Sequence, residues 1–366
     1  MLNLHMKPPS ETKRVAVAMS GGVDSSVVAG LMKQQGYDVI GVTLAMQGNL
    51  APTTDQAAVR DAKKMAEYLD IPHQVVELSD LFRNAVVNPF AESYLGGETP
   101  VPCAACNKKV KFGALWDAVK DLDCDYLITG HYIKWRPAED DGNAQIWRGT
   151  DYRRDQSFFL CQVPMERLNN VRFPLGDLSK DDTRRMAKEM GLEVHDKPDS
   201  QDICFVPTGK YAEVVEKLRP GASEPGDIVH IEDGRVLGQH KGIIYYTIGQ
   251  RRGLEIGGGD PLYVLKLDAA KNQVIVGPTS ALHRKVVYIK DLNWIGDEGW
   301  PAEGREVIAK TRSSQQLKPA RIYANKEDKT AKIVFDEMLD SVAPGQIGVM
   351  YDGDRLLGGG WITGAD

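Results

Sequence analysis

The chain has 366 residues, of which 42% are hydrophobic and 26% charged, and its formal net charge is -6 at pH 7. This length predicts two or three domains with a packed core, and the acidic balance does not support nucleic-acid binding unless basic residues gather locally. No apolar run approaches the roughly 20 residues that a transmembrane helix needs, and the first residues lack the pattern of a secretion signal. We therefore expect no membrane partner, a cytoplasmic location and a monomer.

The first half of the chain alternates predicted strands and helices. An apolar run from Val15 predicts a core strand, and a helix is expected over residues 26–35 with Gly36 as its cap. Further strands are expected at 38–44, 73–78 and 125–133, and further helices within 55–70, 108–122 and 181–190. The last helix should begin at a cap on Ser179, and its exposed face should carry Arg184, Arg185 and Lys188. Such alternation predicts a parallel sheet with helices on both faces.

From about Gly221 the pattern changes to short β-rich runs, at 227–238, 242–250, 261–268 and 272–278, separated by glycine and proline. A second β-rich block begins near Lys285, and Asp-Gly pairs at 233–234 and 352–353 predict hairpin turns. The expected fold is a doubly wound parallel α/β sheet followed by two small antiparallel β domains, the last barrel-like. The expected domain boundaries are 1–210, 211–284 and 285–366.

The segment SGGVDSS at residues 20–26 joins the first predicted strand to the first helix. Its two glycines permit a tight turn and the close approach of an anion, and a helix N-terminus supplies N–H donors. A simple turn with Asp24 or Ser25 as helix cap does not account for both glycines and all three hydroxyls. Neither G-x-x-x-x-G-K-[ST] nor G-x-G-x-x-G is present. The segment resembles the loop of N-type ATP pyrophosphatases, adenine nucleotide alpha hydrolase-like enzymes that release pyrophosphate and pass AMP to a carbonyl oxygen.

Five cysteines in a chain of this size do not indicate a disulfide scaffold. Cys106 lies just before a predicted helix and is followed by Lys108, Lys109 and Lys111. A helix N-terminus and nearby cations lower a thiol pKa from its usual value of about 8.5, so we expect a thiolate at Cys106.

The other cysteines differ in their surroundings. Cys204 follows the polar run 199–202, whereas Cys124 and Cys161 lie in apolar contexts. We expect Cys124 and Cys161 to be buried and structural, and Cys204 to be a second reactive thiol. Burial as an inert cysteine is the alternative for Cys106 and Cys204.

Several motifs occur together and in order along nearly the whole chain. They are SGGVDSS, CNKKVKF at Cys106, TGHY at 129–132, DQSFFL at 155–160, DSQDICF at Cys204, YYTIGQRRG at 245–253 and a final LGGG. In this combination the chain resembles the tRNA-specific 2-thiouridylases. The two cysteine motifs and YTIGQRRG carry most of the specificity, because other adenylating synthetases share the loop.

The resemblance implies a reaction in which ATP, with Mg²⁺, activates the C2 carbonyl of the wobble uridine in tRNAs for Lys, Glu and Gln, after which sulfur replaces the oxygen. Cys204 would receive a persulfide from a sulfur-carrier protein or a cysteine desulfurase, with Cys106 as its catalytic partner. The two cysteines can pair as a disulfide during turnover. Adenylation supplies a leaving group, and both sites must converge on one carbon.

The resemblance also implies binding residues. Those for ATP are Ala18, Met19, Ser20, Gly21, Gly22, Val23, Asp24, Ser25, Leu44 and Gly130. Those for tRNA are Val101, Pro102, Cys103, His131, Arg154, Asp155, Gln156, Arg312, Ser313 and Gln346. Because an extruded base needs phosphate contacts around it, further candidates for that role are Arg153, Arg251, Arg252 and Lys310.

Cys103 stands where these enzymes more commonly have an aspartate. With Cys106 and Cys204 it gives three thiols, the set with which related tRNA thiolases hold a [4Fe–4S] cluster. We favour the persulfide route and keep the cluster as an alternative. Structural zinc wants four ligands, and a thioredoxin-like pair would need a different fold context. Two other functions stay open, namely a ligase or amidotransferase that adenylates a small molecule, and a non-catalytic RNA-binding protein.

Overall fold

The computed structural model describes residues 4–46, 52–137, 144–197, 202–206, 209–257, 259–296 and 299–366. The chain divides into two compact units. The first consists of Met1–Ala85, Cys103–Gln201 and Asp354–Leu356, and the second of Val86–Pro102, Asp202–Gly353 and Leu357–Asp366. In the described ranges, no helix combines the length and the apolar character that crossing a membrane requires.

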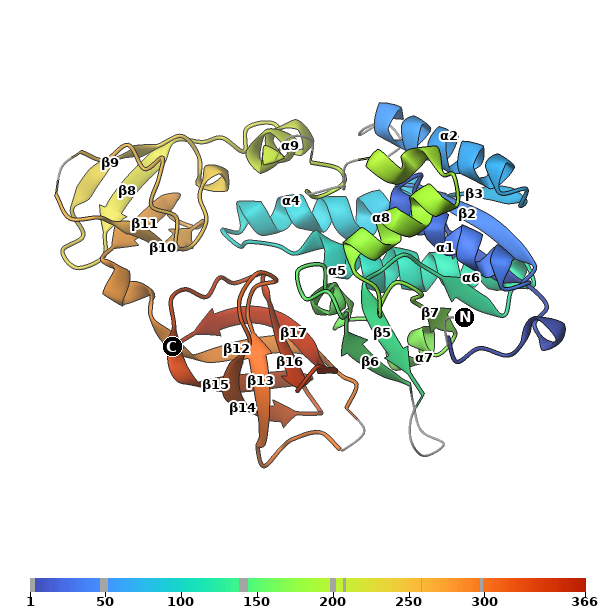
Figure 1. Ribbon diagram of the computed structural model, residues 1–366. Coiled ribbons are helices and arrows are strands. Elements are labelled where there is room, and N and C mark those ends of the chain that lie inside the picture. Colours follow the sequence, from blue (N-terminus) through green and yellow to red (C-terminus); the bar gives the residue numbers. More distant parts are fainter. Residues whose placement is uncertain are drawn as a thin grey trace. The chain divides into compact units, whose positions relative to one another are not determined.

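The first unit is built on a five-stranded parallel sheet in the order β3-β2-β1-β4-β7, of which Figure 1 labels β2, β3 and β7. Its strands are β1 (Val15–Ala18), β2 (Val39–Ala45), β3 (His73–Glu77), β4 (Tyr126–Ile128) and β7 (Val171–Arg172). The order runs outward from β1 to β3 and then returns to β4, so the loops after β1 and β4 lie at the topological switch point. The predicted doubly wound parallel sheet is confirmed, and the two-residue β7 is an addition to it.

Helix α1 (Val23–Gln34) starts three residues earlier than predicted, directly after Gly22, and ends one residue earlier than predicted; Gly36, expected as its cap, follows with φ +89°. Helix α8 (Lys180–Glu189) has the predicted cap, because Ser179 and Asp182 exchange side-chain and backbone hydrogen bonds. The unit's other helical segments are η1 (Pro9–Glu11), α2 (Pro52–Tyr68), α3 (Ser79–Phe82), α6 (Leu115–Asp121), η4 (Ser157–Leu160), α7 (Met165–Leu168) and η5 (Glu193–Asp196).

Two predicted elements of this unit have different limits. The helix expected over 108–122 is part of a longer run, composed of α5 (Pro102–Cys106), the π-helical η3 (Asn107–Ala114) and α6. The strand expected over 125–133 is interrupted after β4 and resumes as β5 (Ile133–Arg136), which pairs with β6 (Gln145–Arg148). The interruption contains Gly130, whose backbone passes close to α1.

The core of the first unit lies between the sheet and its helices. Val17 of β1 and Ile128 of β4 are fully buried against Val27, Val28 and Met32 of α1. Burial on this scale fixes the ends of β1 and β4, and therefore the loops that follow them.

The second unit contains helices α4 (Asn88–Leu95) and α9 (Tyr211–Leu218) and a four-stranded sheet in the order β10-β11-β8-β9. The strands are β8 (Gly226–His230), β9 (Val236–His240), β10 (Tyr263–Asp268) and β11 (Gln273–Gly277). The predicted hairpin at 233–234 is confirmed, with Gly234 at φ +68°. Two details differ from expectation: β8 and β11 pair in parallel, and the run 242–250 contains the 3-10 turn η7 (Ile243–Tyr245) in place of a strand.

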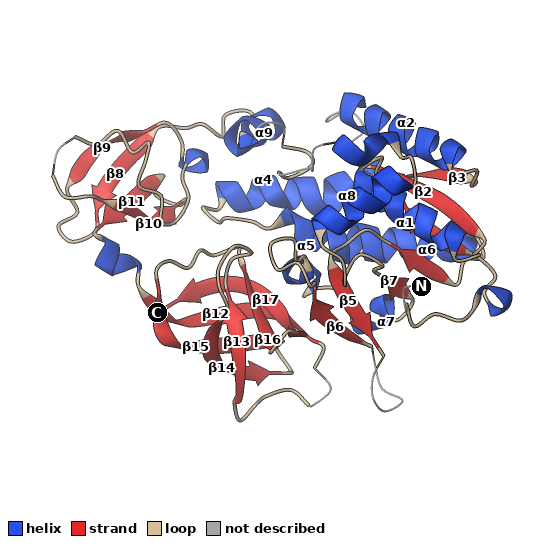
Figure 2. Cartoon of the chain, viewed as in Figure 1, coloured by secondary structure: helices blue, strands red, loops and turns tan. Residues whose placement is uncertain are grey.

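The last part of the second unit is a six-stranded antiparallel barrel closed by pairing of β12 with β17 (Figure 2). Its strands are β12 (Arg284–Trp294), β13 (Arg305–Lys310), β14 (Lys318–Asn325), β15 (Thr330–Leu339), β16 (Ile347–Asp352) and β17 (Arg355–Ala365). Ile322, Ile333, Phe335 and Leu357 are fully buried inside it. The predicted barrel is confirmed.

Candidate active site

The loop between β1 and α1 has the geometry of a phosphate cradle. Gly21 has φ +69°, and a Cβ there would lie 2.7 Å from Asp61 Cβ and 2.9 Å from the Ala58 carbonyl oxygen, so only glycine fits. Ser25 Oγ accepts a hydrogen bond from the Ser20 amide at 3.1 Å and donates to the Gly22 carbonyl at 3.3 Å. These contacts hold the loop in a compact turn at the N-terminus of α1.

The loop after β4 packs directly on this cradle. A Cβ at Gly130 would lie 3.0 Å from Asp24 Cβ and 3.2 Å from the Ser25 amide nitrogen, which is why the two loops can approach so closely. Leu44 lies near the same end of β2, where Thr43 Oγ1 donates to the Met19 carbonyl at 2.9 Å. The residues predicted to bind ATP therefore gather at the C-terminal ends of strands β1, β2 and β4.

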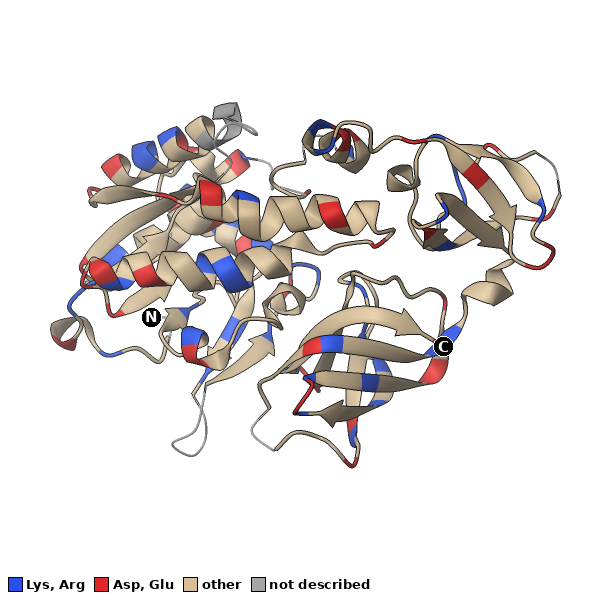
Figure 3. Ribbon diagram, turned by 180° about the vertical axis from the view of Figure 1, so that it is seen from behind, with Lys and Arg blue, Asp and Glu red and all other residues tan. Residues whose placement is uncertain are grey.

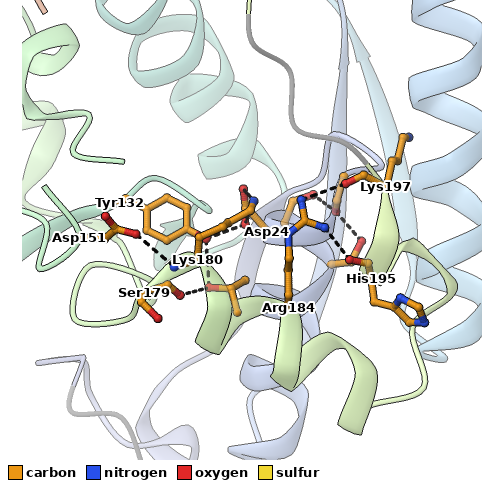
Figure 4. A network of polar contacts seen from close by, with 12 residues as sticks. Asp24, Tyr132, Asp151, Ser179, Lys180, Arg184, His195 and Lys197 are labelled. Carbon is orange, nitrogen blue, oxygen red and sulfur yellow. Dashed lines mark hydrogen bonds and ion pairs between the residues drawn. The ribbon is translucent and has the colours of Figure 1, made fainter. Parts of the chain in front are cut away.

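A buried lysine and a tyrosine converge on Asp24 (Figure 4). Lys180 Nζ donates to both carboxylate oxygens, at 2.8 and 2.9 Å, and the Tyr132 hydroxyl donates to Oδ1 at 2.8 Å. Lys180 is not among the residues that the sequence predicts for ATP binding. No sequence signal connects two residues 156 positions apart.

A second lysine reaches the loop from the segment after η5. Lys197 Nζ donates to the Gly21 carbonyl at 2.9 Å and to Asp61 Oδ2 at 2.8 Å. The hydrogen bond from Lys197 is the main cause that lowers the pKa of Asp61. Arg184 is partly exposed and donates to the carbonyls of His195 and Lys197, whereas Arg185 and Lys188 are exposed, as expected for a solvated face.

Cys106 is buried, and the prediction that it is a thiolate is wrong. The residue ends α5 and continues in helical conformation into η3, so it does not occupy an exposed helix N-terminus. Burial raises the pKa of the Cys106 thiol to about 11, although the charge of Lys111 acts in the opposite direction. Desolvation outweighs the nearby cation because a thiolate loses its hydration in an apolar site.

Cys204 has the opposite environment and lies exposed in the second unit. The next two residues anchor it: Phe205 and Val206 are 5% and 1% exposed, and the Phe205 ring packs edge-on against Phe90 at 5.1 Å. The Val206 amide donates to the Ile203 carbonyl at 2.9 Å, which closes a turn around Cys204. Residues 199–201 of the predicted polar run lie outside the described residues.

The remaining three cysteines are Cys103, Cys124 and Cys161. Cys124 and Cys161 are buried, as predicted, and Cys103 is exposed on α5. Within the ranges that the structure describes, no three His, Cys, Asp or Glu side chains are grouped as metal ligands. The cluster alternative, which draws Cys103 and Cys106 from the first unit and Cys204 from the second, remains a prediction.

Five residues predicted to contact tRNA lie in the first unit, namely Cys103, described above, and His131, Arg154, Asp155 and Gln156. His131 Nδ1 is 2.8 Å from Thr129 Oγ1, and burial lowers the pKa of this imidazole well below its usual value. Gln156 Oε1 accepts from the Tyr132 amide at 3.0 Å, which connects this stretch to the loop after β4. Asp155 has a side chain only 2% exposed and accepts from Ser157 and Gly149, an arrangement typical of a structural carboxylate. Arg154 is partly exposed in the turn before it.

The other predicted contacts lie in the second unit. Val101 and Pro102 are buried, Ser313 is exposed, Gln346 Nε2 donates to the Thr99 carbonyl at 2.8 Å, and Arg312 donates to Ser341 Oγ.

The four further residues predicted to contact tRNA phosphates differ in their exposure to solvent. Arg153, Arg251 and Arg252 are exposed. Lys310 is 5% exposed and donates to the Ser313 carbonyl, so exposure does not support its predicted phosphate contact. In the view of Figure 3, basic and acidic residues are interspersed along the described helices and strands.

Comparison with known proteins agrees with this geometry. Three family models match the chain. The model described as the tRNA methyl transferase HUP domain matches residues 13–208, the model described as the tRNA methyl transferase PRC-barrel domain matches 214–278, and the model described as the aminomethyltransferase beta-barrel domain matches 284–362. The chain is 50% identical to a tRNA-specific 2-thiouridylase MnmA of Parvibaculum lavamentivorans, over 96% of this chain and 91% of that protein.

Two further relatives have the same printed name. The chain is 49% identical to the protein from a Methylobacterium species, covering 97% of this chain and 95% of the relative. It is also 49% identical to the protein from Sinorhizobium fredii, covering 99% of this chain and 94% of the relative. The chain therefore belongs to the tRNA-specific 2-thiouridylase family.

Proposed function

We propose that the chain is a tRNA 2-thiouridylase, a sulfurtransferase that converts the wobble uridine of tRNAs for Lys, Glu and Gln into 2-thiouridine. The C2 carbonyl oxygen attacks the α-phosphorus of ATP, and the bond from that phosphorus to pyrophosphate breaks. The outer sulfur of a Cys204 persulfide then attacks C2 and AMP leaves. The Cys106 thiolate attacks the inner sulfur, which releases 2-thiouridine and leaves a disulfide that a thiol reductant reopens.

One observation carries this proposal. The cradle at residues 18–25 occurs in a chain about half identical, over nearly its full length, to proteins named tRNA-specific 2-thiouridylases. Adenylation turns the uridine oxygen into a leaving group, and two positioned thiols supply and release the sulfur.

The burial of Cys106 fits a thiol that acts late in the reaction. With its pKa raised to about 11, the side chain is protonated at neutral pH and protected from external electrophiles. We propose that Cys106 loses its proton only when the Cys204 persulfide and the activated base are in place. The exposed Cys204 suits the opposite task of receiving sulfur from a donor protein.

The finer assignments follow from the same proposal. ATP brings Mg²⁺ on its phosphates, and Asp24, the only carboxylate among residues 18–25, fits the oxygen ligands that this ion takes. We also propose the predicted tRNA contacts, a persulfide donor protein as partner, a cytoplasmic location, and domains at 1–210, 211–284 and 285–366.

The test is detection of 2-thiouridine by mass spectrometry in unmodified glutamate tRNA, with ATP and a persulfide donor. Wild type, Cys103→Ala and the control Cys124→Ala are compared, since Cys124 is a buried cysteine that lies outside the cysteine motifs. The proposal predicts ATP-dependent product from all three. No product from a folded wild type contradicts the proposed activity, and loss in Cys103→Ala alone replaces the two-thiol route by the three-thiol cluster.

A further inference from the structure

Tyr152 is the most exposed large hydrophobic residue among those that the structure describes, at 58%. It lies in the turn between β6 and η4 in the first unit. Single apolar residues are common on protein surfaces, so exposure alone does not indicate a site. The surroundings of this tyrosine distinguish it, because they hold an exposed ring in one position.

Two contacts fix the side chain of Tyr152. Its hydroxyl donates to Asp354 Oδ2 at 2.8 Å, and the guanidinium carbon of Arg148 lies over the ring, 4.1 Å from its centroid. With a cation on one face and 58% of the residue exposed, the other face of the ring is open to solvent. An aromatic ring with one open face, already stacked on an arginine, is the kind of surface on which nucleobases stack.

Arg148 is itself held in place. Its Nε donates to Asp155 Oδ2 at 3.4 Å and its Nη1 to Asp354 Oδ1 at 3.1 Å, and its side chain is 16% exposed. Asp354 therefore binds both the hydroxyl of Tyr152 and the arginine that covers its ring. Because ring and guanidinium are positioned before a ligand arrives, stacking on them costs little conformational entropy.

The turn that carries Tyr152 is connected to the phosphate cradle through Asp151. Asp151 Oδ2 accepts a hydrogen bond from the Lys180 amide at 3.4 Å, and the side chain of Lys180 reaches Asp24 in the cradle (Figure 4). Enzymes that act on a base take it out of the stack. When the wobble uridine leaves the anticodon stack, its neighbours lose a stacking partner that an exposed ring can replace.

We propose that Tyr152 stacks against an unpaired base of the tRNA anticodon loop next to the wobble uridine. This inference rests on the proposed function and adds a base contact to the phosphate contacts predicted nearby. Arg153 follows Tyr152 and is exposed, so its guanidinium is available to the phosphate of the same nucleotide. Stacking tolerates any base, because every base has a π face. Tyr152 therefore holds the loop without discriminating among the tRNAs for Lys, Glu and Gln.

The test measures binding of unmodified glutamate tRNA to the full chain by fluorescence anisotropy, without ATP or a sulfur donor. For Tyr152→Ala we expect affinity to fall about five- to a hundredfold, the effect typical of losing one stacked base. Tyr152→Phe should bind close to wild type because it keeps the ring. The control Tyr68→Ala removes a tyrosine of the same unit that is 55% exposed and donates to the Met190 carbonyl, and it should bind as wild type does.

Salt dependence separates stacking from charge. The slope of log affinity against log salt concentration should be the same in Tyr152→Ala and wild type, whereas loss of a phosphate contact flattens it. A second measurement uses anticodon stem–loops that carry the fluorescent base 2-aminopurine on either side of the wobble uridine. At one of the two positions, fluorescence should be lower in the complex with wild type than in the complex with Tyr152→Ala, because stacking on the ring quenches this base.

Wild-type affinity or a flattened salt slope in Tyr152→Ala would overturn the inference, as would equal fluorescence of the two complexes at both positions. Equal losses in Tyr152→Ala and Tyr152→Phe would overturn it by assigning the effect to the hydrogen bond with Asp354. Weaker binding of the persulfide donor by Tyr152→Ala, with tRNA binding unchanged, would assign the ring to a protein partner instead. If wild type makes no 2-thiouridine yet shows these binding differences, the proposed function fails while the role of Tyr152 stands.

Discussion

Cys106 and Cys204 are the same residue type in opposite environments. Cys106 is 7% exposed within a continuous helical run of the first unit, whereas Cys204 is exposed on a turn of the second unit. Lysines follow Cys106 closely in sequence, yet burial decides its pKa. The chemistry of a thiol therefore depends on what surrounds it in space, and the exposure of Cys204 supports our proposal that this cysteine takes up the sulfur.

The largest expected effect is the loss of sulfur uptake in Cys204→Ser. We expect 2-thiouridine formation to fall by about a thousandfold or more, since a hydroxyl carries no persulfide. ATP binding should be unchanged, because the cradle lies in the first unit. The rate is measured with a persulfide donor in excess, and Cys124→Ser serves as the control for cysteine removal. Substantial activity in Cys204→Ser would reverse the roles given to the two cysteines.

The anchoring of Cys204 by Phe205 is tested by Phe205→Ala. Truncating a buried phenylalanine to alanine costs about 3 to 5 kcal/mol, and at this position it removes the edge-on packing of the ring against Phe90. We expect faster amide hydrogen exchange in the peptide that contains residues 202–206. Phe205→Leu should show a smaller change, and unaltered exchange in Phe205→Ala would mean that this packing does not hold the turn.

Alkylation of Cys106 should depend steeply on pH. With a pKa of about 11, about one thousandth of the Cys106 thiol is ionised at pH 8, and the iodoacetamide rate should rise about tenfold per pH unit toward that pKa. Peptide mass spectrometry gives the rate at this cysteine separately from the others. A rate that levels off below pH 9 would show that the thiol is not desolvated.

The same shift contributes to stability. The pKa of Cys106 is higher in the folded chain than in the unfolded one, so the unfolded state loses the proton first as pH rises. The contribution is fully present below about pH 9 and declines by at most about 3 kcal/mol as pH passes through about 11. Urea unfolding of wild type and Cys106→Ala from pH 8 to 11 should show a steeper decline for wild type. Parallel curves would contradict the assignment.

Local patterns predicted much of the fold. The alternation of strands and helices, the Ser179 cap, the 233–234 hairpin and the glycine-containing loop at 20–26 each depend on residues close in sequence, and each is present. The parallel pairing of β8 with β11 could not be predicted in the same way, because it joins strands from different hairpins.

The site shows the same division between local and distant information. The glycines of the loop revealed the cradle, but Lys180 reaches Asp24 across 156 positions and has no local signature. Lys310 and Cys106 looked like an exposed cation and an activated thiol in sequence, and tertiary packing buries both. Burial is a property of the whole fold, so neighbouring residues alone do not determine it.

The most direct test of the account is to trace sulfur before tRNA is present. The full chain is incubated with a persulfide donor and ATP, trapped with an alkylating reagent, and its cysteine peptides are analysed by mass spectrometry. The account predicts one additional sulfur atom on the peptide that carries Cys204, and none on the peptide that carries Cys106. Additional sulfur on Cys106 while Cys204 remains unmodified would contradict the central claim that the exposed cysteine takes up sulfur.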